Sequence, residues 1–298
     1  MERRTFVNNT ALLAIAISTS GFIRFDGHNF VGDCETTTDI LGPFYRPNSP
    51  LRHNLSINGE SGDAIELVGK INHNDCTTPY SKAKIELWHC DAKGVYDNTS
   101  QEYRYRGTTF SDLNGDYKFN TILPVPYDIG NGTIRPAHFH MMISAEGYQP
   151  LVTQLYFVGD DYIEKDETAS SPSAKKRILD VVRLGNGNKK VVVDVNMSQN
   201  LSPESAAINK LVGVYTDDKK LLKKVFFNKD NALWMKNELF GVNFNYMGDN
   251  TFTLPGVDIK NKLSYHFEIL SLHTTRLTIS ELDHNGKKQV QVLTKEKV

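Results

Sequence analysis

Short segments that alternate between apolar and polar residues dominate the chain from about residue 64 to residue 197. β-Branched and aromatic residues are frequent in them, and turn signals such as Asn114-Gly115 separate them. Alternation with a period of two lets each strand bury one face and expose the other. The expected strands cover residues 64–71, 83–89, 117–122, 139–144, 152–157 and 190–196. This pattern predicts an all-β protein whose main part is an antiparallel β-sandwich.

A polar stretch near residues 198–207 interrupts the strands and marks a domain boundary. Beyond it the chain holds further short strands, is richer in lysine and has no second His-x-His pair. We therefore expect the sandwich to occupy residues 21–200 and a small antiparallel β accessory domain of unknown role to occupy residues 205–298. One short helix is expected around residues 173–182.

The first twenty residues resemble an export signal. Paired arginines at positions 3 and 4 precede a short apolar stretch that ends in small residues near position 20. That stretch is too short to span a bilayer and has the length of a signal-peptide core. The Arg-Arg-x-Phe pattern resembles a twin-arginine signal, although Glu2 and Asn8 depart from it. We expect residues 1–20 to be a signal peptide and the protein to be exported, to the periplasm or the medium; a frayed amphipathic helix is the alternative.

Composition excludes several classes of partner. The 298 residues carry a formal net charge of −1 and contain no basic block, which argues against a nucleic-acid partner. No apolar run approaches the length that spans a membrane. The oligomeric state stays open, and a homo-oligomer is compatible with this composition.

The three cysteines, Cys34, Cys76 and Cys90, lack the spacing of a metal site. In an oxidising compartment Cys34 can pair with Cys76 and leave Cys90 as a buried thiol on a strand. Sequence alone leaves the other pairings open.

The segment Ile-Arg-Pro-Ala-His-Phe-His, residues 134–140, gives the strongest indication of function. His138 and His140 are two positions apart, which directs both imidazoles to one face of a strand, and Pro136 favours extended backbone ahead of them. Tyr127 ends a proline-containing lead-in to the same region. Two imidazole nitrogens and a phenolate oxygen can form a metal site, and phenolate is a hard ligand suited to Fe(III). A His-x-His pair alone is a weak signal, so its neighbours carry the inference.

An iron site needs a further protein donor before Tyr127. Tyr96 follows a turn at residues 91–94, and a residue just after a hairpin turn lies at the end of a sheet, where loops build sites. Tyr103 and Tyr105 are alternatives on spacing alone. Each of these tyrosines can equally be an ordinary core or rim aromatic.

Several segments together resemble the intradiol ring-cleavage dioxygenases, the non-haem Fe(III) family that includes catechol 1,2-dioxygenase and protocatechuate 3,4-dioxygenase. The resemblance runs in order over about residues 39–160, and its Tyr…Arg-Pro-x-His-x-His core is highly specific. The segments are Leu-Gly-Pro-Phe-Tyr (41–45), Ile-Glu-Leu-Trp-His…Gly-Val-Tyr (85–96), Gly-Asp-Tyr-Lys-Phe-Asn-Thr-Ile-Leu-Pro…Tyr (115–127), Arg-Pro-Ala-His-Phe-His (135–140) and Thr-Gln-Leu-Tyr-Phe (153–157).

The resemblance implies an Fe(III) cofactor and a set of ligands for it. Tyr96 matches the first tyrosinate of the family, and Tyr127 matches the second, the axial one that substrate displaces. His138 and His140 match the two histidine ligands. Because ionising a tyrosine at pH 7 costs about 4 kcal/mol, a trivalent ion must supply that stabilisation by direct coordination.

The resemblance also implies an activity. Such an enzyme cleaves a catechol-type ring between its two hydroxylated carbons with O₂ and gives a cis,cis-muconate-type product; its partners are a small aromatic diol and O₂. Arg135 and Gln154 match the family's arginine and glutamine beside the iron ligands. Arg135 would stabilise carbanion character in the ring, and its structural alternative is a salt bridge that holds the loop.

One segment departs from the family pattern. Residues 128–134, between Tyr127 and Arg135, are short and lack an aromatic side chain. That region helps to shape the substrate pocket in the family, so we expect a more open pocket, and the preferred catechol stays open.

Two rival interpretations belong to other classes. A non-catalytic prealbumin-like binding module shares strand-turn-strand units of this kind but has no need of the His-x-His segment. A cupin would use the His-x-His pair with Fe(II), Mn or Zn and a glutamate, but Glu146 comes too late in the sequence for that role.

Overall fold

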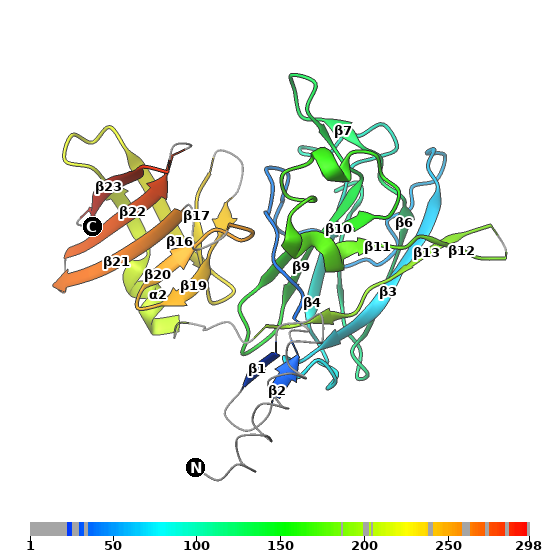
Figure 1. Cartoon of the computed structure of the whole chain (residues 1–298), viewed down its shortest axis with the longest axis horizontal. Coiled ribbons are helices and arrows are strands. Elements are labelled where there is room, and N and C mark those ends of the chain that lie inside the picture. Colours follow the sequence, from blue (N-terminus) through cyan, green and yellow to red (C-terminus); the bar gives the residue numbers. More distant parts are fainter. Residues whose placement is uncertain are drawn as a thin grey trace, which may run out of the picture.

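The structure is a computed structural model, and two assemblies of strands lie side by side in it (Figure 1). The expected signal segment and Cys34 lie outside the described residues. The structure describes residues 23–25, 30–32, 35–185, 187–198, 203, 205–237, 241–257, 263–271, 274–283 and 286–296.

One sheet of the sandwich carries the His-x-His segment at its centre. Strand β9 (His138–Ser144) lies between β4 (Lys84–Trp88) and β10 (Leu151–Phe157), and it is antiparallel to both. On the outside, β5 (Arg106–Phe110) is antiparallel to β4, whereas β11 (Ile178–Leu179) runs parallel to β10. A central strand is shielded on both edges, so the side chains of β9 are held in a fixed register.

The second sheet is built around β3 (Ala64–Asn72). Strand β6 (Asp116–Ile122) pairs with it antiparallel. On the other side, β13 (Lys189–Val192) and β14 (Val195–Asn196) follow one another along β3, both parallel to it, and β12 (Val182–Arg183) pairs with β13.

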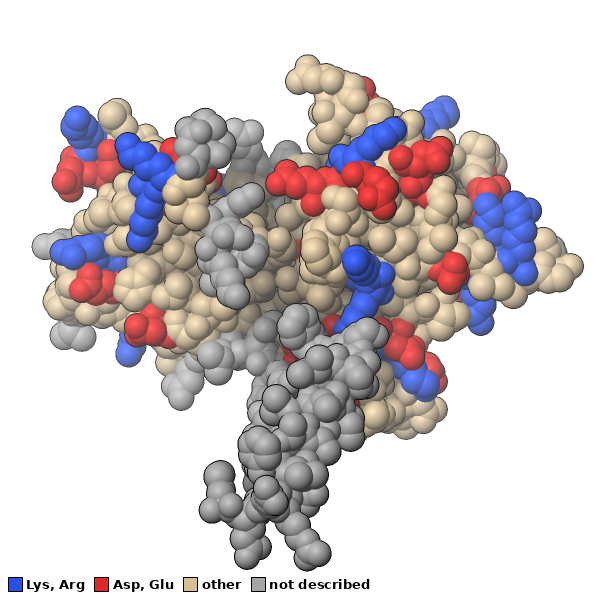
Figure 2. Space-filling view, viewed as in Figure 1, with Lys and Arg blue, Asp and Glu red and all other residues tan. Residues whose placement is uncertain are grey.

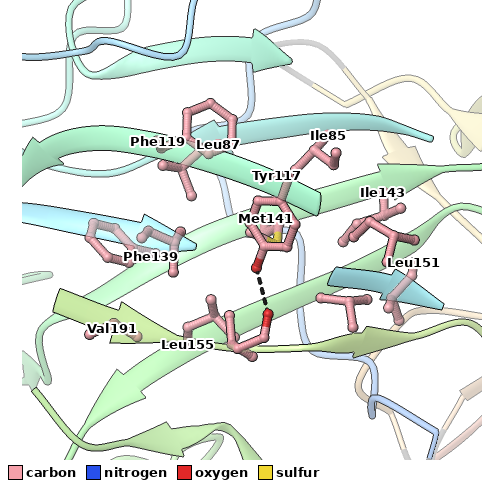
Figure 3. Close-up of a cluster of buried hydrophobic side chains, with 14 of the residues drawn as sticks. Ile85, Leu87, Tyr117, Phe119, Phe139, Met141, Ile143, Leu151, Leu155 and Val191 are labelled. Carbon is pink, nitrogen blue, oxygen red and sulfur yellow. Dashed lines mark hydrogen bonds between the residues drawn. The ribbon is translucent and has the colours of Figure 1, made fainter. Parts of the chain in front are cut away.

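The inner faces of the two sheets enclose a core of buried apolar side chains (Figure 3). Phe139 and Met141 enter it from β9 and Leu155 from β10, while Leu67 and Phe119 enter it from the second sheet. Burying each side chain of this size stabilises the fold by about 1.5–3 kcal/mol. Because alternate residues of β9 face this core, His138 and His140 must face the other side of their sheet.

Gly69 explains why residues 190–196 form two short strands and not the single strand expected from the sequence. A Cβ atom at Gly69 would lie 1.8 Å from the carbonyl oxygen of Val193. The chain bulges towards β3 there, and the Tyr117 hydroxyl donates a hydrogen bond of 2.8 Å to the same oxygen (Figure 3). The ladder of β13 therefore stops before Val193 and resumes in β14.

The C-terminal part forms one nine-stranded antiparallel sheet with its own core, which includes Phe226, Phe252 and Phe267. A short helix, α2 (Ser205–Leu211), precedes it and buries Ile208 and Leu211 in that core. The strands are β15 (Gly213–Thr216), β16 (Lys223–Lys229), β17 (Ala232–Met235), β18 (Val242–Asn243), β19 (Asn245–Gly248), β20 (Thr251–Thr253), β21 (Leu263–Ser271), β22 (Thr274–Leu282) and β23 (Lys288–Lys295).

Two hairpins stand apart from these sheets. Strands β1 (Ile23–Phe25) and β2 (Phe30–Gly32) form one of them, near the N-terminal end. Strands β7 (Tyr127–Asp128) and β8 (Ile134–Arg135) form the other, which ends in an exposed turn.

The all-β sandwich expected from the sequence is confirmed, and the differences are local. The helix expected around residues 173–182 is a 3₁₀ helix over Pro172–Arg177, a second short 3₁₀ helix covers Ile163–Lys165, and strands β11 and β12 occupy the rest of the expected span. Helix α2 was not expected. Alternation identifies strands but does not give their relative direction, so the parallel pairings could not be predicted from the sequence.

Cys90 is free and buried, as expected, and Cys76 is disulfide-bonded. Among the described residues, no helix is both long and apolar enough to cross a membrane. On the face shown in Figure 2, basic and acidic side chains are interspersed and do not form large patches of one sign.

The contact at Gly69 yields a stability prediction. Gly69→Ala should destabilise the protein by about 3 kcal/mol or more, since the new methyl group meets a backbone oxygen that cannot move without breaking the β13–β14 junction. Gly185→Ala is the matched control, because nothing lies within 4 Å of a Cβ atom there. Urea unfolding measures both; equal midpoints for the two variants would contradict this account.

Candidate metal centre

His138 and His140 project together from the face of β9 that is turned away from the sandwich core. Their Cα partners on β10 are Tyr156 and Gln154, and His140 also lies opposite Trp88 of β4. Both imidazoles are almost completely buried, and their Nε2 atoms are 3.1 Å apart. The two-residue spacing thus brings two nitrogen donors to one point, as predicted.

Burial keeps both imidazoles neutral. It lowers the pKa of His138 to about 3, with the nearby Arg135 cation adding to the effect, and it holds the pKa of His140 well below its usual value. Nδ1 of His138 lies 2.7 Å from the carbonyl oxygen of Pro136. A neutral imidazole in that position donates Nδ1–H, which leaves Nε2 with a free lone pair directed into the site.

Two tyrosines approach the imidazole pair from separate loops. The Tyr96 oxygen lies 3.5 Å from His138 Nε2, and Tyr96 is buried under Phe44, whose ring stacks on it at 4.3 Å. The Tyr127 ring lies 5.4 Å from the Tyr96 ring and 5.6 Å from the His138 ring. Tyr127 is only half-buried, because it lies on the exposed β7–β8 hairpin.

The structure distinguishes Tyr96 from Tyr103 and Tyr105, the two alternatives for the further metal donor. Tyr103 lies under the Arg46 guanidinium, at 4.1 Å from its ring centroid, and Tyr105 donates a hydrogen bond of 2.6 Å to Glu60. Neither contacts the imidazole pair. Of these three tyrosines, Tyr96 is the one that the fold places beside His138, whereas its role as a ligand stays a prediction.

The donor set fits a hard trivalent ion. Burial raises the pKa of Tyr96 far above its ordinary value, and that of Tyr127 as well, so neither phenol ionises at neutral pH without a cation beside it. No group of three or more His, Cys, Asp or Glu side chains suited to a metal occurs among the described residues. Glu146, which a cupin-type site would need, is exposed in a turn. Two phenols and two imidazoles lie together here, and this mixture of oxygen and nitrogen donors suits Fe(III).

Gly42 and Gly94 let the loops approach the site. Both have positive φ angles, and a Cβ atom at Gly42 would lie 3.0 Å from the His140 ring. At Gly94 it would lie 2.7 Å from Cβ of Tyr127. The Leu-Gly-Pro-Phe-Tyr segment thus packs Gly42 on His140 and Phe44 on Tyr96.

Arg135 and Gln154, both singled out from the sequence, lie in contact behind the imidazole pair. Arg135 donates a hydrogen bond of 2.9 Å to Oε1 of Gln154, and its Nε pairs with Asp166 at 2.6 Å. Gln154 in turn donates from Nε2 to the carbonyl oxygen of Ile40 at 2.7 Å. The guanidinium is therefore a buried cation in a fixed position, and it also forms the salt bridge considered as its structural role.

Sequence reasoning missed the buried polar network that holds Arg135. Tyr156 accepts a hydrogen bond from Arg135 and donates to Asp39 at 3.0 Å, and Asp39 forms a buried ion pair with Arg177. The members come from segments up to 138 residues apart. The one local signal was the position of Tyr156 two residues after Gln154, on the same face of a strand.

Comparison with known proteins places this geometry in a family. The sequence model of the dioxygenase family matches residues 40–203, more than half of the chain. The chain belongs to the intradiol dioxygenases. The matched region holds all six residues predicted for the site and ends before the C-terminal sheet.

Chlorocatechol 1,2-dioxygenase of Rhodococcus opacus is 33% identical over 161 residues, which cover 46% of this chain and 62% of that protein. Hydroxyquinol 1,2-dioxygenase of Corynebacterium glutamicum is 31% identical over 181 residues, 55% of this chain and 58% of that one. The chain thus spans about three-fifths of the length of these relatives. The chain also matches the crystal structure of 3-chlorocatechol 1,2-dioxygenase from Rhodococcus opacus 1CP with 24% sequence identity and a TM-score of 0.50. The match covers 63% of this chain and 77% of the other, and it shows a likeness of fold.

The close approach of Gly94 yields a test of the Tyr127 position. Gly94→Ala should displace Tyr127 and weaken ferric-ion retention about tenfold, because the new methyl group overlaps the tyrosine. Gly132→Ala is the control: this residue also has a positive φ angle, at the tip of the same hairpin, but nothing lies within 4 Å of its Cβ. Iron content after dialysis against a chelator measures both. Equal retention in the two variants would place Tyr127 outside the metal site.

Proposed function

We propose that this protein is a ferric intradiol dioxygenase that opens a catechol-type ring between its two hydroxylated carbons with O₂. The observation that carries the proposal is the convergence of Tyr96, Tyr127, His138 and His140 on one buried point. The names of the relatives support the substrate class, since chlorocatechol, hydroxyquinol and catechol are all 1,2-dihydroxybenzenes.

The four donors would hold the iron. Bound Fe(III) would supply Lewis acidity that favours the ionised forms of the tyrosines and of the diol. His138 and His140 each offer a neutral Nε2. Trp88 stacks on His140 and Phe44 on Tyr96, so these aromatic side chains keep water from the donor atoms.

Tyr127 is the tyrosine best placed to move when substrate binds. It lies on a two-residue strand pair, and its hairpin continues into an exposed turn with positive φ angles at Gly130, Asn131 and Gly132. Tyr96, in contrast, is buried against Phe44. The phenolate oxygen of a displaced Tyr127 would accept a proton from one hydroxyl group of the diol.

Arg135 would stabilise negative charge on the ring. Its guanidinium is fixed by Asp166, Gln154 and Tyr156, so little reorganisation is needed when charge develops during the reaction. The exposed β7–β8 turn lacks aromatic side chains, which supports an open pocket that accepts substituted catechols.

The activity can be tested with a panel of catechol, protocatechuate, hydroxyquinol and chlorocatechols. We expect O₂ uptake with at least one of them and a muconate-type product. Tyr127→Phe should lower kcat by about a hundredfold, since it removes a ligand and a proton acceptor. Tyr105→Phe, a buried tyrosine away from the imidazole pair, should leave kcat unchanged. A yellow semialdehyde product, or equal kcat values for the two variants, would contradict the proposal.

We also propose that the protein is exported. The basic and apolar pattern of residues 1–20 supports this, and so does the disulfide-bonded Cys76, because disulfides persist in oxidising compartments. N-terminal sequencing of protein recovered from the periplasm or the medium should show residues 1–20 removed. An intact N-terminus on cytosolic protein would exclude export.

A further inference from the structure

The C-terminal sheet packs against residues that adjoin the candidate metal centre, although the family match ends before this sheet. One cluster of buried apolar side chains contains Tyr96 and has Tyr127 packed against it, and its members come from both halves of the chain. We call this the interface cluster: Leu41, Tyr45, Trp88, Cys90, Tyr96, Met142, Val152, Ala232 and Trp234.

Three aromatic contacts lead from the C-terminal sheet to His140. The Trp234 ring of β17 lies 5.7 Å from the Tyr45 ring, and Tyr45 packs edge-on against Trp88 at 5.2 Å. The Trp88 indole then stacks on the His140 imidazole, with centroids 5.0 Å apart and an angle of 3° between the planes. Side chains packed in this way cannot rotate independently.

Two hydrogen bonds fix Tyr45 at the middle of this path. Nζ of Lys229, at the end of β16, donates a hydrogen bond of 2.6 Å to the Tyr45 hydroxyl, which donates to Oε1 of Glu86 at 3.3 Å. The same ammonium group lies 4.9 Å from the centre of the Tyr45 ring and 4.7 Å from that of Trp234. Burial and the Glu86 carboxylate raise the pKa of Tyr45, so it stays a neutral phenol and keeps both hydrogen bonds.

An ion pair between Lys84 and Asp230 also joins the two halves beside this contact. Lys84 of β4 lies 3.2 Å from Glu86 and 3.2 Å from Asp230, which follows Lys229 in the turn of the β16–β17 hairpin. The hairpin is therefore anchored to the strand that carries Trp88 by charged as well as aromatic contacts.

His140 needs this support because its Nδ1 has no polar anchor. His138 is oriented by the hydrogen bond from Nδ1 to Pro136, whereas Nδ1 of His140 has no hydrogen-bond partner among the described residues. Apart from the 3.1 Å contact between the two Nε2 atoms, the plane of the His140 ring is set by packing, against Trp88 on one side and Gly42 near its edge. A metal-binding histidine is usually oriented by a hydrogen bond from the ring nitrogen that does not bind the metal. In His140 the stacked indole of Trp88 orients the ring instead.

We infer that Lys229 and Trp234 of the C-terminal hairpin are positioning residues for the dioxygenase site, acting through Tyr45 and Trp88 on the His140 imidazole. This inference rests on the proposed function for its consequence, metal retention, but the contacts themselves are independent of any metal. The C-terminal sheet lies outside the region that matches the family, and the inference gives this sheet a role in the site.

The test compares Lys229→Met with Lys224→Met, which makes the same change on the same strand five residues before the one that contacts Tyr45. In iron-loaded protein, Lys229→Met should speed iron loss to a chelator about tenfold and shift the tyrosinate-to-iron absorption band. Lys224→Met should match the wild type. Trp234→Leu should act like Lys229→Met, and Lys229→Met remains informative if Trp234→Leu fails to fold.

A second readout needs no metal. The imidazole proton resonances of His140, assigned by their loss in His140→Gln, carry the ring-current shift of the stacked Trp88. In metal-free protein Lys229→Met should move these resonances, and Lys224→Met should not. Unmoved resonances together with a wild-type rate of iron loss in folded Lys229→Met would overturn the inference. A wild-type protein that binds no ferric ion, but whose His140 resonances respond to Lys229→Met, would refute the proposed function and leave the positioning role intact.

Discussion

The alternation of side chains along β9 is the constraint on which the rest of the structure depends. Phe139 and Met141 enter the sandwich core, and this burial fixes the register of the strand between β4 and β10. A shift of one residue would turn both imidazoles into the apolar core and turn Phe139 into the candidate metal centre, at a cost of several kcal/mol. The same burial that stabilises the fold therefore aims His138 and His140 at the candidate metal centre.

Burial in the centre disfavours the charged forms of the histidines and tyrosines when no metal ion is bound. Burial lowers the pKa of both histidines and raises that of both tyrosines, so the four donors are neutral on their own. Phenolate formation is favourable only next to a strongly charged ion, and two phenolates then favour the ferric over the ferrous state.

Much of the site could be predicted from the sequence, because its signals are local. The His-x-His spacing, the proline-stiffened approach to Tyr127 and the Arg135-Pro136 pair act within a few residues of one another. Tyr96 could not be separated from Tyr103 and Tyr105 by spacing, since the choice depends on how the chain turns after residue 94. The Asp39–Arg177 ion pair and the break between strands at Val193 could not be predicted either, because each depends on a contact between distant segments. The contacts of Trp234 and Lys229 with Tyr45 also join distant segments, so the sequence alone could not predict them.

The central claim is that two tyrosines and two histidines hold one ferric ion. Anomalous X-ray scattering at the iron absorption edge, from crystals of protein loaded with Fe(III), tests it most directly. The account predicts a single strong peak within bonding distance of the Tyr96 and Tyr127 oxygens and of Nε2 of His138 and His140. A peak elsewhere in the chain, or zinc bound by the histidines with both tyrosines unbound, would contradict it.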